Sequence, residues 1–329
     1  MTVTSQPTDG PSPALAGPGA GAAARRLFLS TRPAFFTAAI APILVGSSAA
    51  AAALGRIDVT LLALALAATV LAQAATNVYN DVGDDVIGAD AGNTGRIYPY
   101  TGGSRFIQTG LLTRADMSRL ALGLAVAALA VGVVLTLLRG PGIVLLGLAG
   151  LALGLLYSMP GPQLSARGIG ELAVGVGFGP LPLLGSLWLQ RAPVTSGAVL
   201  LSLAVGAWVT AILLINEVPD READARAGKR TLVVRFGADG ARRIYIGLTV
   251  LALLASAGAI ALYVLPLWYA LPAAALAVMG ATAARGISAD PGGRGRLKKS
   301  IEMTLAIHAL GAIALCVALL AQLAVHRFG

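Results

Sequence analysis

Long apolar stretches alternate with short polar segments along most of the chain. A helix needs about 20 apolar residues to cross the hydrocarbon core of a bilayer. Runs of this kind predict about nine membrane-spanning helices, at residues 33–54, 59–79, 119–138, 142–159, 170–190, 197–216, 243–263, 265–285 and 301–325. The pattern therefore predicts an all-α integral membrane protein, with its helices bundled around a central cavity that is capped by cytoplasmic loops.

The segment before the first run, residues 1–32, is rich in Pro, Gly, Ser and Ala. This composition predicts a disordered cytoplasmic tail, followed by a single transmembrane domain over residues 33–329. A secretory signal is the alternative interpretation of this region. The run at 33–54 is too long for the apolar part of a signal peptide, and no convincing cleavage site follows it, so we assign it as the first span.

The composition supports the membrane assignment and excludes other classes. Hydrophobic residues make up 57% of the chain and charged residues only 12%, whereas soluble domains carry about 25% charged residues. The net charge of +9 does not indicate nucleic-acid binding, because the basic residues lie between apolar runs and form no single basic face or tail. The single cysteine, Cys316, excludes an intramolecular disulfide and a cysteine-based metal site.

The basic residues also predict how the chain is oriented. Twenty of the 24 lie in the N-terminal segment or in the connections after the second, fourth, sixth and eighth runs. Cytoplasmic loops of membrane proteins carry the excess of Lys and Arg. We therefore expect a multi-pass plasma-membrane protein with a cytoplasmic N-terminus. Two cytoplasmic connections, 80–118 and 217–242, are long and hold most of the acidic residues.

The first acidic cluster begins at the cytoplasmic end of the second run. It contains Asn77, Asn80, Asp81, Asp84, Asp85 and Asp90. If the helix continues beyond the span, Asp81, Asp84 and Asp85 share one face, because positions i, i+3 and i+4 are neighbours. Gly88 can then break the helix and turn Asp90 back towards this group.

The second acidic cluster follows the sixth run, where Asn216, Asp220 and Asp224 recur at every fourth position. Carboxylates this close repel each other unless a cation neutralises them. Mg²⁺ takes oxygen ligands and is often shared with substrate phosphates. Two such faces opposite each other would hold a diphosphate through Mg²⁺, and Lys229 with nearby arginines would neutralise the remaining charge. A solvated acidic helix end is the alternative for either cluster alone.

These residues resemble the two motifs of the UbiA superfamily of membrane prenyltransferases. Asn80-Asp81-x-x-Asp84 with Gly88-x-Asp90 is similar to its first motif, and Asn216-x-x-x-Asp220-x-x-x-Asp224-x-x-x-Gly228-Lys229-x-Thr231 to its second. Further matches are Arg32-Pro33, Gly102-Gly103-Ser104-Arg105, Tyr157 and Arg167-Gly168-x-Gly170-Glu171. The resemblance extends from about residue 30 to the end of the chain. It is strongest for the menaquinone-type 1,4-dihydroxy-2-naphthoate polyprenyltransferase branch, although Glu217-Val-Pro219 departs from the tripeptide of many naphthoate enzymes.

The resemblance implies an enzyme that transfers a polyprenyl group from polyprenyl diphosphate to an aromatic acceptor, with Mg²⁺ as the cofactor. The implied metal ligands are Asp81, Asp84, Asp85, Asp90, Asp220 and Asp224. Of these, Asp81, Asp84, Asp220 and Asp224 are also the implied catalytic residues, together with Tyr157. The implied substrate-binding residues are Asn77, Asn80, Arg96, Arg105, Arg167, Asn216, Arg221 and Lys229.

Three alternatives stay open on the sequence. A transporter would place its acidic residues near the bilayer midplane within broken helices, whereas these lie at the ends of the runs. A prenyltransferase with another acceptor, or a terpene cyclase, would share the same clusters. A non-catalytic assembly subunit is the third. In each case membrane lipid surrounds the protein.

Overall fold

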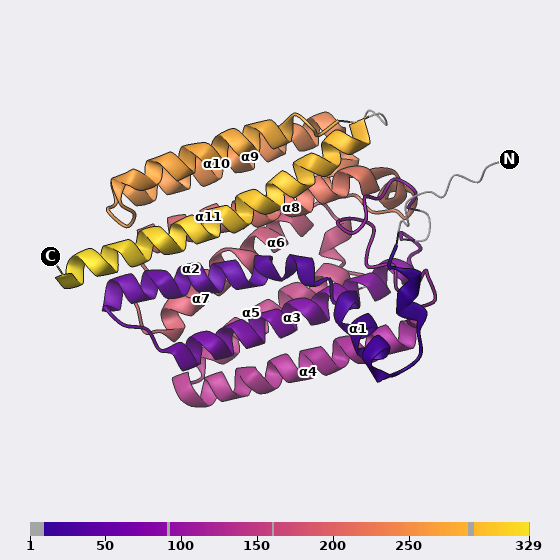
Figure 1. Cartoon of the computed structure of the whole chain (residues 1–329), viewed down its shortest axis with the longest axis horizontal. Helices are drawn as coiled ribbons and strands as arrows, with labels where there is room; N and C mark the ends of the chain where they lie inside the picture. Colours follow the sequence, from indigo (N-terminus) through magenta and orange to yellow (C-terminus); the bar gives the residue numbers. More distant parts are fainter. Residues whose placement is uncertain (1–9, 91–92, 160, 289–292, 329) are drawn as a thin grey trace.

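A computed structural model of the protein describes residues 10–90, 93–159, 161–288 and 293–328. These residues form helices that lie side by side along one direction, and the described ranges contain no strand (Figure 1). The first helix and the connection between α3 and α4 lie at the same end of the bundle (Figure 1). The all-α prediction is confirmed.

The α-helices account for all nine predicted runs. Eight described segments are long and apolar enough to cross a membrane, and α5 is a shorter apolar helix. Short 3-10 turns lie at Pro13–Ala16, Pro33–Phe35, Leu164–Ala166 and Leu267–Tyr269. The α-helices are α1 (Ala20–Ser30), α2 (Phe36–Leu54), α3 (Val59–Val86), α4 (Arg114–Arg139), α5 (Gly142–Ser158), α6 (Gly170–Phe178), α7 (Pro180–Leu189), α8 (Ser196–Arg226), α9 (Leu232–Ala261), α10 (Ala270–Ala284) and α11 (Arg294–Phe328).

Two helices extend well beyond their apolar runs. α3 continues to Val86, and α8 continues through Pro219 to Arg226. The expected long connection over 217–242 is therefore wrong, since only residues 227–231 separate α8 from α9. Hydropathy marks where a helix leaves the hydrocarbon, but backbone hydrogen bonds continue as long as helix-forming residues follow. Both acidic clusters consequently lie mainly on helical extensions.

The segment before the first span is also more ordered than its composition predicts. Residues 20–30 form α1, whose alanines favour helix. The Arg26 guanidinium fixes this helix to the preceding turn by donating to the carbonyl oxygens of Leu15 (2.7 Å) and Gly17 (3.0 Å). The expected disorder is therefore wrong for residues 10–32, and residues 1–9 lie outside the described part of the chain.

The fifth predicted span is broken into α6 and α7 at Gly179. Its backbone, with φ −111° and ψ −94°, is not helical, and Pro180 begins the next helix. A Cβ at Gly179 would lie 2.7 Å from the Cα of Gly206 and 2.6 Å from the carbonyl oxygen of Ser202. The glycine therefore allows the break between α6 and α7 to pack directly on the backbone of α8.

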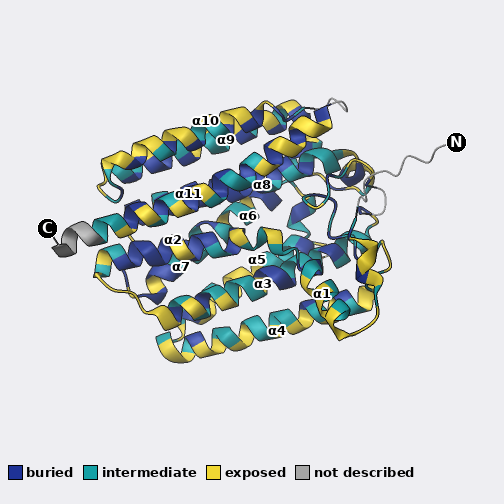
Figure 2. Ribbon diagram, viewed as in Figure 1, coloured by how far each residue is buried: buried dark blue, intermediate teal, exposed yellow. Residues whose placement is uncertain are grey.

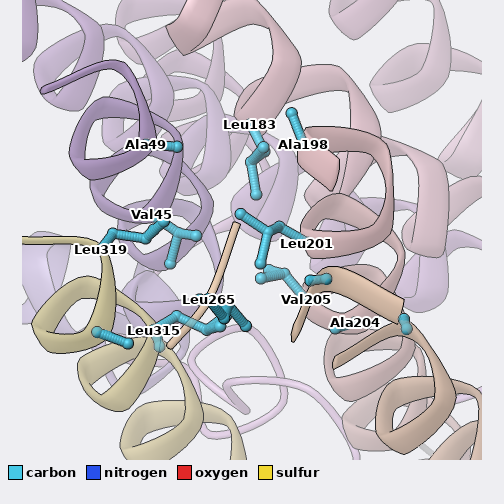
Figure 3. Close-up of a cluster of buried hydrophobic side chains, with 14 of the residues drawn as sticks. Val45, Ala49, Leu183, Ala198, Leu201, Ala204, Val205, Leu265, Leu315 and Leu319 are labelled. Carbon is cyan, nitrogen blue, oxygen red and sulfur yellow. The ribbon is translucent and has the colours of Figure 1, made fainter. Parts of the chain in front are cut away.

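α8 is the central helix of the bundle, with 78% of its apolar window buried, whereas α4 buries only 11%. The main core cluster joins α8 to α2, α7 and α11 through residues such as Val45, Leu183, Leu201 and Leu315 (Figure 3). Exposed and intermediate residues make up most of α4 (Figure 2). They include the exposed apolar side chains of Leu122, Val126 and Leu137, as expected for a helix that faces lipid. The central position of α8 places the second acidic cluster inside the protein.

Candidate active site

Lys229 joins the two acidic clusters. Its Nζ atom lies 2.6 Å from Oδ1 of Asp84, at the end of α3, and 3.3 Å from Oδ1 of Asp224, at the end of α8. All three side chains are largely buried, with exposed fractions of 9%, 14% and 11% for Lys229, Asp84 and Asp224. We call this arrangement the lysine bridge. The two carboxylate faces predicted from the sequence therefore lie opposite each other, with an ammonium group between them.

The electrostatics of the lysine bridge keep Lys229 charged. Burial by itself lowers the pKa of a lysine, because it disfavours the charged form. The carboxylates of Asp84 and Asp224 outweigh this effect, so the pKa of Lys229 is raised above its ordinary value. The bridge therefore holds a permanent positive charge where the two clusters meet.

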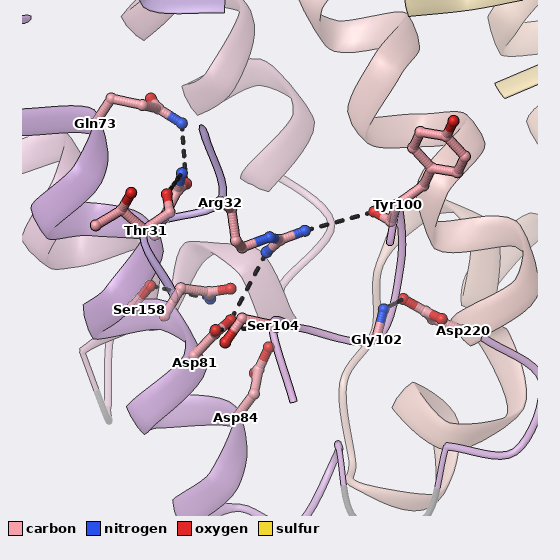
Figure 4. A network of polar contacts seen from close by, with 12 residues as sticks. Thr31, Arg32, Gln73, Asp81, Asp84, Tyr100, Gly102, Ser104, Ser158 and Asp220 are labelled. Carbon is pink, nitrogen blue, oxygen red and sulfur yellow. Dashed lines mark hydrogen bonds and ion pairs between the residues drawn. The ribbon is translucent and has the colours of Figure 1, made fainter. Parts of the chain in front are cut away.

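Arg32 connects the first cluster to the corner between α1 and α2. Its Nη1 atom lies 3.7 Å from Oδ1 of Asp81, and its Nη2 donates to the carbonyl oxygen of Tyr100 at 3.5 Å (Figure 4). The guanidinium also lies 4.8 Å from the centre of the Phe35 ring. Arg32 was not among the predicted site residues, although the Arg32-Pro33 match marked its position.

The described part of the α3–α4 loop, residues 87–90 and 93–113, contacts both clusters. The amide N–H of Ser104 donates to Oδ2 of Asp81 at 3.0 Å. Asp220 is held through both oxygens. The Gly102 N–H donates to Oδ2 at 3.0 Å (Figure 4), and Asn93 Nδ2 donates to Oδ1 at 2.7 Å. Sequence reasoning missed Asn93, since nothing in the loop's pattern indicates which helix it contacts.

Asp90 lies buried within this loop. Gly88 adopts a positive φ of 76°, as expected for the turn that ends the helix. Burial, together with the nearby charges of Asp84 and Asp81, raises the pKa of Asp90 to about 8. The predicted return of Asp90 towards the first cluster is confirmed.

Gly103 makes a close approach to Asp90 that only glycine permits. Its φ is +72°, and a Cβ there would lie 2.5 Å from Oδ2 of Asp90. We expect Gly103→Ala to displace Asp90 and to lower both thermal stability and enzymatic activity. Gly110→Ala is the matched control, because Gly110 has a φ of +70° with no atom near its Cβ position. Both variants share a backbone cost of about 1–2 kcal/mol, so equal losses in thermal unfolding and activity would show that the contact with Asp90 has no role.

Asp85 lies apart from the other carboxylates of its cluster. It accepts hydrogen bonds from Arg114 Nη2 at 2.6 Å and from Gln108 Nε2 at 3.2 Å. The side chain therefore contacts the start of α4 and the loop before it. Consecutive helical residues point about 100° apart, so Asp85 cannot follow Asp84 towards Lys229. Its predicted role as a metal ligand has no support in this geometry.

The predicted amide residues fix the local packing of the helices. Asn77 donates from Nδ2 to the carbonyl oxygen of Thr31 at 2.9 Å and accepts from Gln73 Nε2 at 2.9 Å. Asn80 donates from Nδ2 to the hydroxyl of Ser158 at 3.2 Å, at the end of α5. Asn216 differs, because its Oδ1 is buried and has no hydrogen-bond partner.

The predicted arginines are distributed around the site. Arg96 donates to the carbonyl oxygen of Asn93, and Arg105 donates to that of Asp90, so both support the α3–α4 loop. The other two predicted arginines lie elsewhere: Arg167 is exposed in the α5–α6 connection, and Arg221 is half-buried on α8. Lys229, the remaining predicted cation, contacts both acidic clusters.

Tyr157, at the end of α5, faces the acidic end of the bundle. Its hydroxyl interacts electrostatically with Glu217, Lys229, Asp84 and Glu171. The predicted catalytic role of Tyr157 stays a prediction.

The donor chemistry of the site fits Mg²⁺, although the lysine bridge occupies part of it. Within the described ranges, no three Asp, Glu, His or Cys side chains converge as a preformed metal site. Oδ1 of Asp81 and Oδ2 of Asp90 are nevertheless buried without hydrogen-bond partners. Carboxylate oxygens are the ligands that Mg²⁺ prefers, and it commonly shares them with substrate phosphates. A Mg²⁺–phosphate group could therefore engage these oxygens while Lys229 turns to the phosphate.

The helical membrane bundle with two facing aspartate clusters agrees with the membrane prenyltransferase class that the sequence motifs resemble. The model of the UbiA prenyltransferase family matches residues 39–307, and the chain belongs to this family. It is 36% identical over 221 residues to the 1,4-dihydroxy-2-naphthoate octaprenyltransferase of Mycobacterium tuberculosis, covering 67% of this chain and 73% of that one. The enzyme of the same name from Escherichia coli is 34% identical over 225 residues, covering 66% and 70%.

Solved structures of the family share the fold. A UbiA homolog from Aeropyrum pernix K1 aligns with a TM-score of 0.63 and 18% identity, covering 88% of this chain and 98% of that one. A UbiA homolog from Archaeoglobus fulgidus bound to DMAPP and Mg²⁺ aligns with a TM-score of 0.60 and 16% identity, covering 89% and 99%. These likenesses support the helical architecture.

Proposed function

We propose that the protein transfers a polyprenyl group from polyprenyl diphosphate to 1,4-dihydroxy-2-naphthoate, in menaquinone biosynthesis, with Mg²⁺ as the cofactor. The lysine bridge carries this proposal, because it brings two carboxylate faces and a permanent cation together at one end of a membrane bundle. Relatives named 1,4-dihydroxy-2-naphthoate octaprenyltransferase support the acceptor.

The reaction breaks the bond between C1 of the prenyl chain and the diphosphate oxygen, and the electron pair leaves with the diphosphate. A carbon of the electron-rich ring then forms a bond to C1, and that carbon releases its former substituent, either a proton or the carboxylate as carbon dioxide, so that the ring regains its aromaticity. Mg²⁺, when bound, supplies positive charge for the diphosphate, and Asp81, Asp84, Asp90, Asp220 and Asp224 would hold it directly or through water. Lys229 would neutralise the remaining phosphate charge. The α3–α4 loop would exclude water, which otherwise captures the developing cation.

The placement in the membrane follows from the charge asymmetry of the connections. We propose a plasma-membrane protein with a cytoplasmic N-terminus, so that the site opens to the cytoplasm. The isoprenoid tail of the donor would lie among the apolar helices and extend into lipid.

Removal of the metal gives a direct test of the proposal. Membranes containing the protein would receive labelled polyprenyl diphosphate, Mg²⁺ and a panel of aromatic acids that includes 1,4-dihydroxy-2-naphthoate. We expect a prenylated naphthoate product together with diphosphate release, and we expect loss of both when EDTA replaces free Mg²⁺. Membranes lacking the protein are the control. Product formation on another ring would contradict the acceptor, and release that persists in EDTA would contradict the metal dependence.

A further inference from the structure

Two buried glutamates lie beside the site, and neither is among the predicted metal ligands or substrate-binding residues. Glu171, in the first turn of α6, is 3% exposed, and Glu217, on α8, is 9% exposed. Their carboxyl groups lie close to each other, and we call them the glutamate pair.

The pair leaves one acceptor atom free. Oε1 of Glu171 accepts a hydrogen bond from the N–H of Leu232, at the start of α9, at 2.8 Å. Glu217 Oε2 is buried and has no hydrogen-bond partner. A buried acceptor without a partner costs about 1–3 kcal/mol. Oε2 of Glu217 therefore needs a hydrogen-bond donor that none of the described residues supplies.

The position of Glu217 indicates which substrate supplies this donor. Glu217 precedes Asp224 by seven residues, so the two lie on the same stripe of α8, with Glu217 deeper in the bundle. Tyr157, at the end of α5, lies within electrostatic range of the glutamate pair and of Lys229 and Asp84. An acceptor ring that attacks C1 must lie about 3–3.5 Å from it, next to the diphosphate. The glutamate pair therefore lies on the side of the site where this ring must fit.

We propose that Glu217, with Glu171 beside it, binds a ring hydroxyl of the aromatic acceptor, and that Tyr157 completes this acceptor subsite. The proposal rests on the function proposed above and adds the residues that select the acceptor. A hydroxyl donates to Glu217 Oε2 and satisfies the free oxygen. A site built in this way rejects a ring that cannot donate, since the buried oxygen would then stay unpaired.

The test compares acceptors that differ in this single hydrogen bond. Wild-type protein would be assayed with 1,4-dihydroxy-2-naphthoate and with each of its mono-O-methyl ethers. We expect one ether to be used at least about tenfold less efficiently than the free hydroxyl compound, as for the loss of one hydrogen bond. In Glu217→Leu we expect the ratio of the efficiency with the free hydroxyl compound to that with the ether, which measures this preference, to fall towards one. The KM for the acceptor should rise about tenfold, while the KM for the prenyl diphosphate stays within about twofold.

Two further variants separate recognition from packing. Glu217→Gln keeps a carbonyl oxygen and should retain part of the preference. Glu222→Leu is the matched control, because Glu222 lies on the same helix with 78% of its side chain exposed, and it should behave like wild type. An unchanged preference in Glu217→Leu would overturn the proposal, as would equal increases in both KM values, because a purely structural pair would disturb both substrates.

A binding measurement keeps this inference distinct from the proposed function. Equilibrium binding of 1,4-dihydroxy-2-naphthoate and of its ethers would be measured without donor, on wild-type protein and on Glu217→Leu. Binding without turnover in the wild type would contradict the proposed function, and the loss of preference in the variant would still support the subsite. Failure of the wild type to bind the naphthoate would overturn the subsite itself.

Discussion

Replacement of Asp84 by asparagine is expected to reduce prenyl transfer by at least about a hundredfold, the range seen when a group that stabilises transition-state charge is removed. Asparagine keeps the volume of aspartate but loses the negative charge that holds Lys229 at 2.6 Å. The same change removes one of the proposed Mg²⁺ ligands. Transfer of labelled polyprenyl groups in membranes measures the effect, and a higher Mg²⁺ requirement should accompany any residual activity.

Asp58→Asn provides the matched control for this prediction. Asp58 is the N-cap residue of α3, at the opposite end of the helix, where it accepts from the N–H of Leu61 at 3.1 Å. Asparagine is an equally good N-cap, so this variant should keep near-wild-type activity. The transfer rates of Asp84→Asn and Asp58→Asn would then be compared. If they differ by no more than about threefold, which is well below the effect of one ordinary electrostatic interaction, Asp84 does not act in catalysis.

Replacement of Lys229 by methionine is expected to destabilise the protein most strongly in the absence of Mg²⁺. The change leaves Asp84 and Asp224 buried and facing each other without the ammonium between them. Removal of one partner from a buried ionic group costs about 3–5 kcal/mol. Mg²⁺ should recover part of this loss by binding the two carboxylates, so its stabilising effect should be larger in Lys229→Met than in the wild type. Prenyl transfer should fall about a hundredfold or more, because the diphosphate loses a cation.

Thermal unfolding in detergent, with EDTA or with Mg²⁺, measures the stability effect. Lys298→Met is the control. Lys298 also lies at the end of the bundle that carries the α3–α4 loop, but 52% of its side chain is exposed and its contact with Glu302 is 3.9 Å long. Exposed ion pairs contribute about 0–1 kcal/mol, so this variant should unfold like wild type. If both lysine variants lose the same stability, or if Mg²⁺ shifts Lys229→Met no more than the wild type, the lysine bridge does not have the proposed role.

The two predictions together separate the parts played by charge and by metal. Asp84→Asn removes a negative charge from the lysine bridge, and Lys229→Met removes the positive one. If Lys229 and Mg²⁺ compete for the same carboxylates, the first variant should weaken the response to Mg²⁺ and the second should strengthen it. An equal response in both variants would indicate that Mg²⁺ binds elsewhere in the protein.

The sequence determined the helical class, the nine apolar runs and the carboxylate faces of α3 and α8, because these features depend on residues a few positions apart. The spacing of Asp220 and Asp224 fixes a shared face as soon as the segment is helical. The positive φ at Gly88 also followed from local chemistry. The extent of α8 beyond its apolar run was not predicted, since hydropathy reports burial in lipid and not the end of backbone hydrogen bonding.

Only the tertiary structure decided which side chains meet. Asn93 contacts Asp220 across 127 positions, and Asp81 and Ser104 meet across 23. Such contacts depend on how whole helices pack and where a long loop closes, which no local pattern encodes. The same packing directed Asp85 to Arg114 and brought Glu171 against Glu217. The sequence therefore supplied the chemical groups of the site, and the packing of α3, α5, α6 and α8 determined their partners.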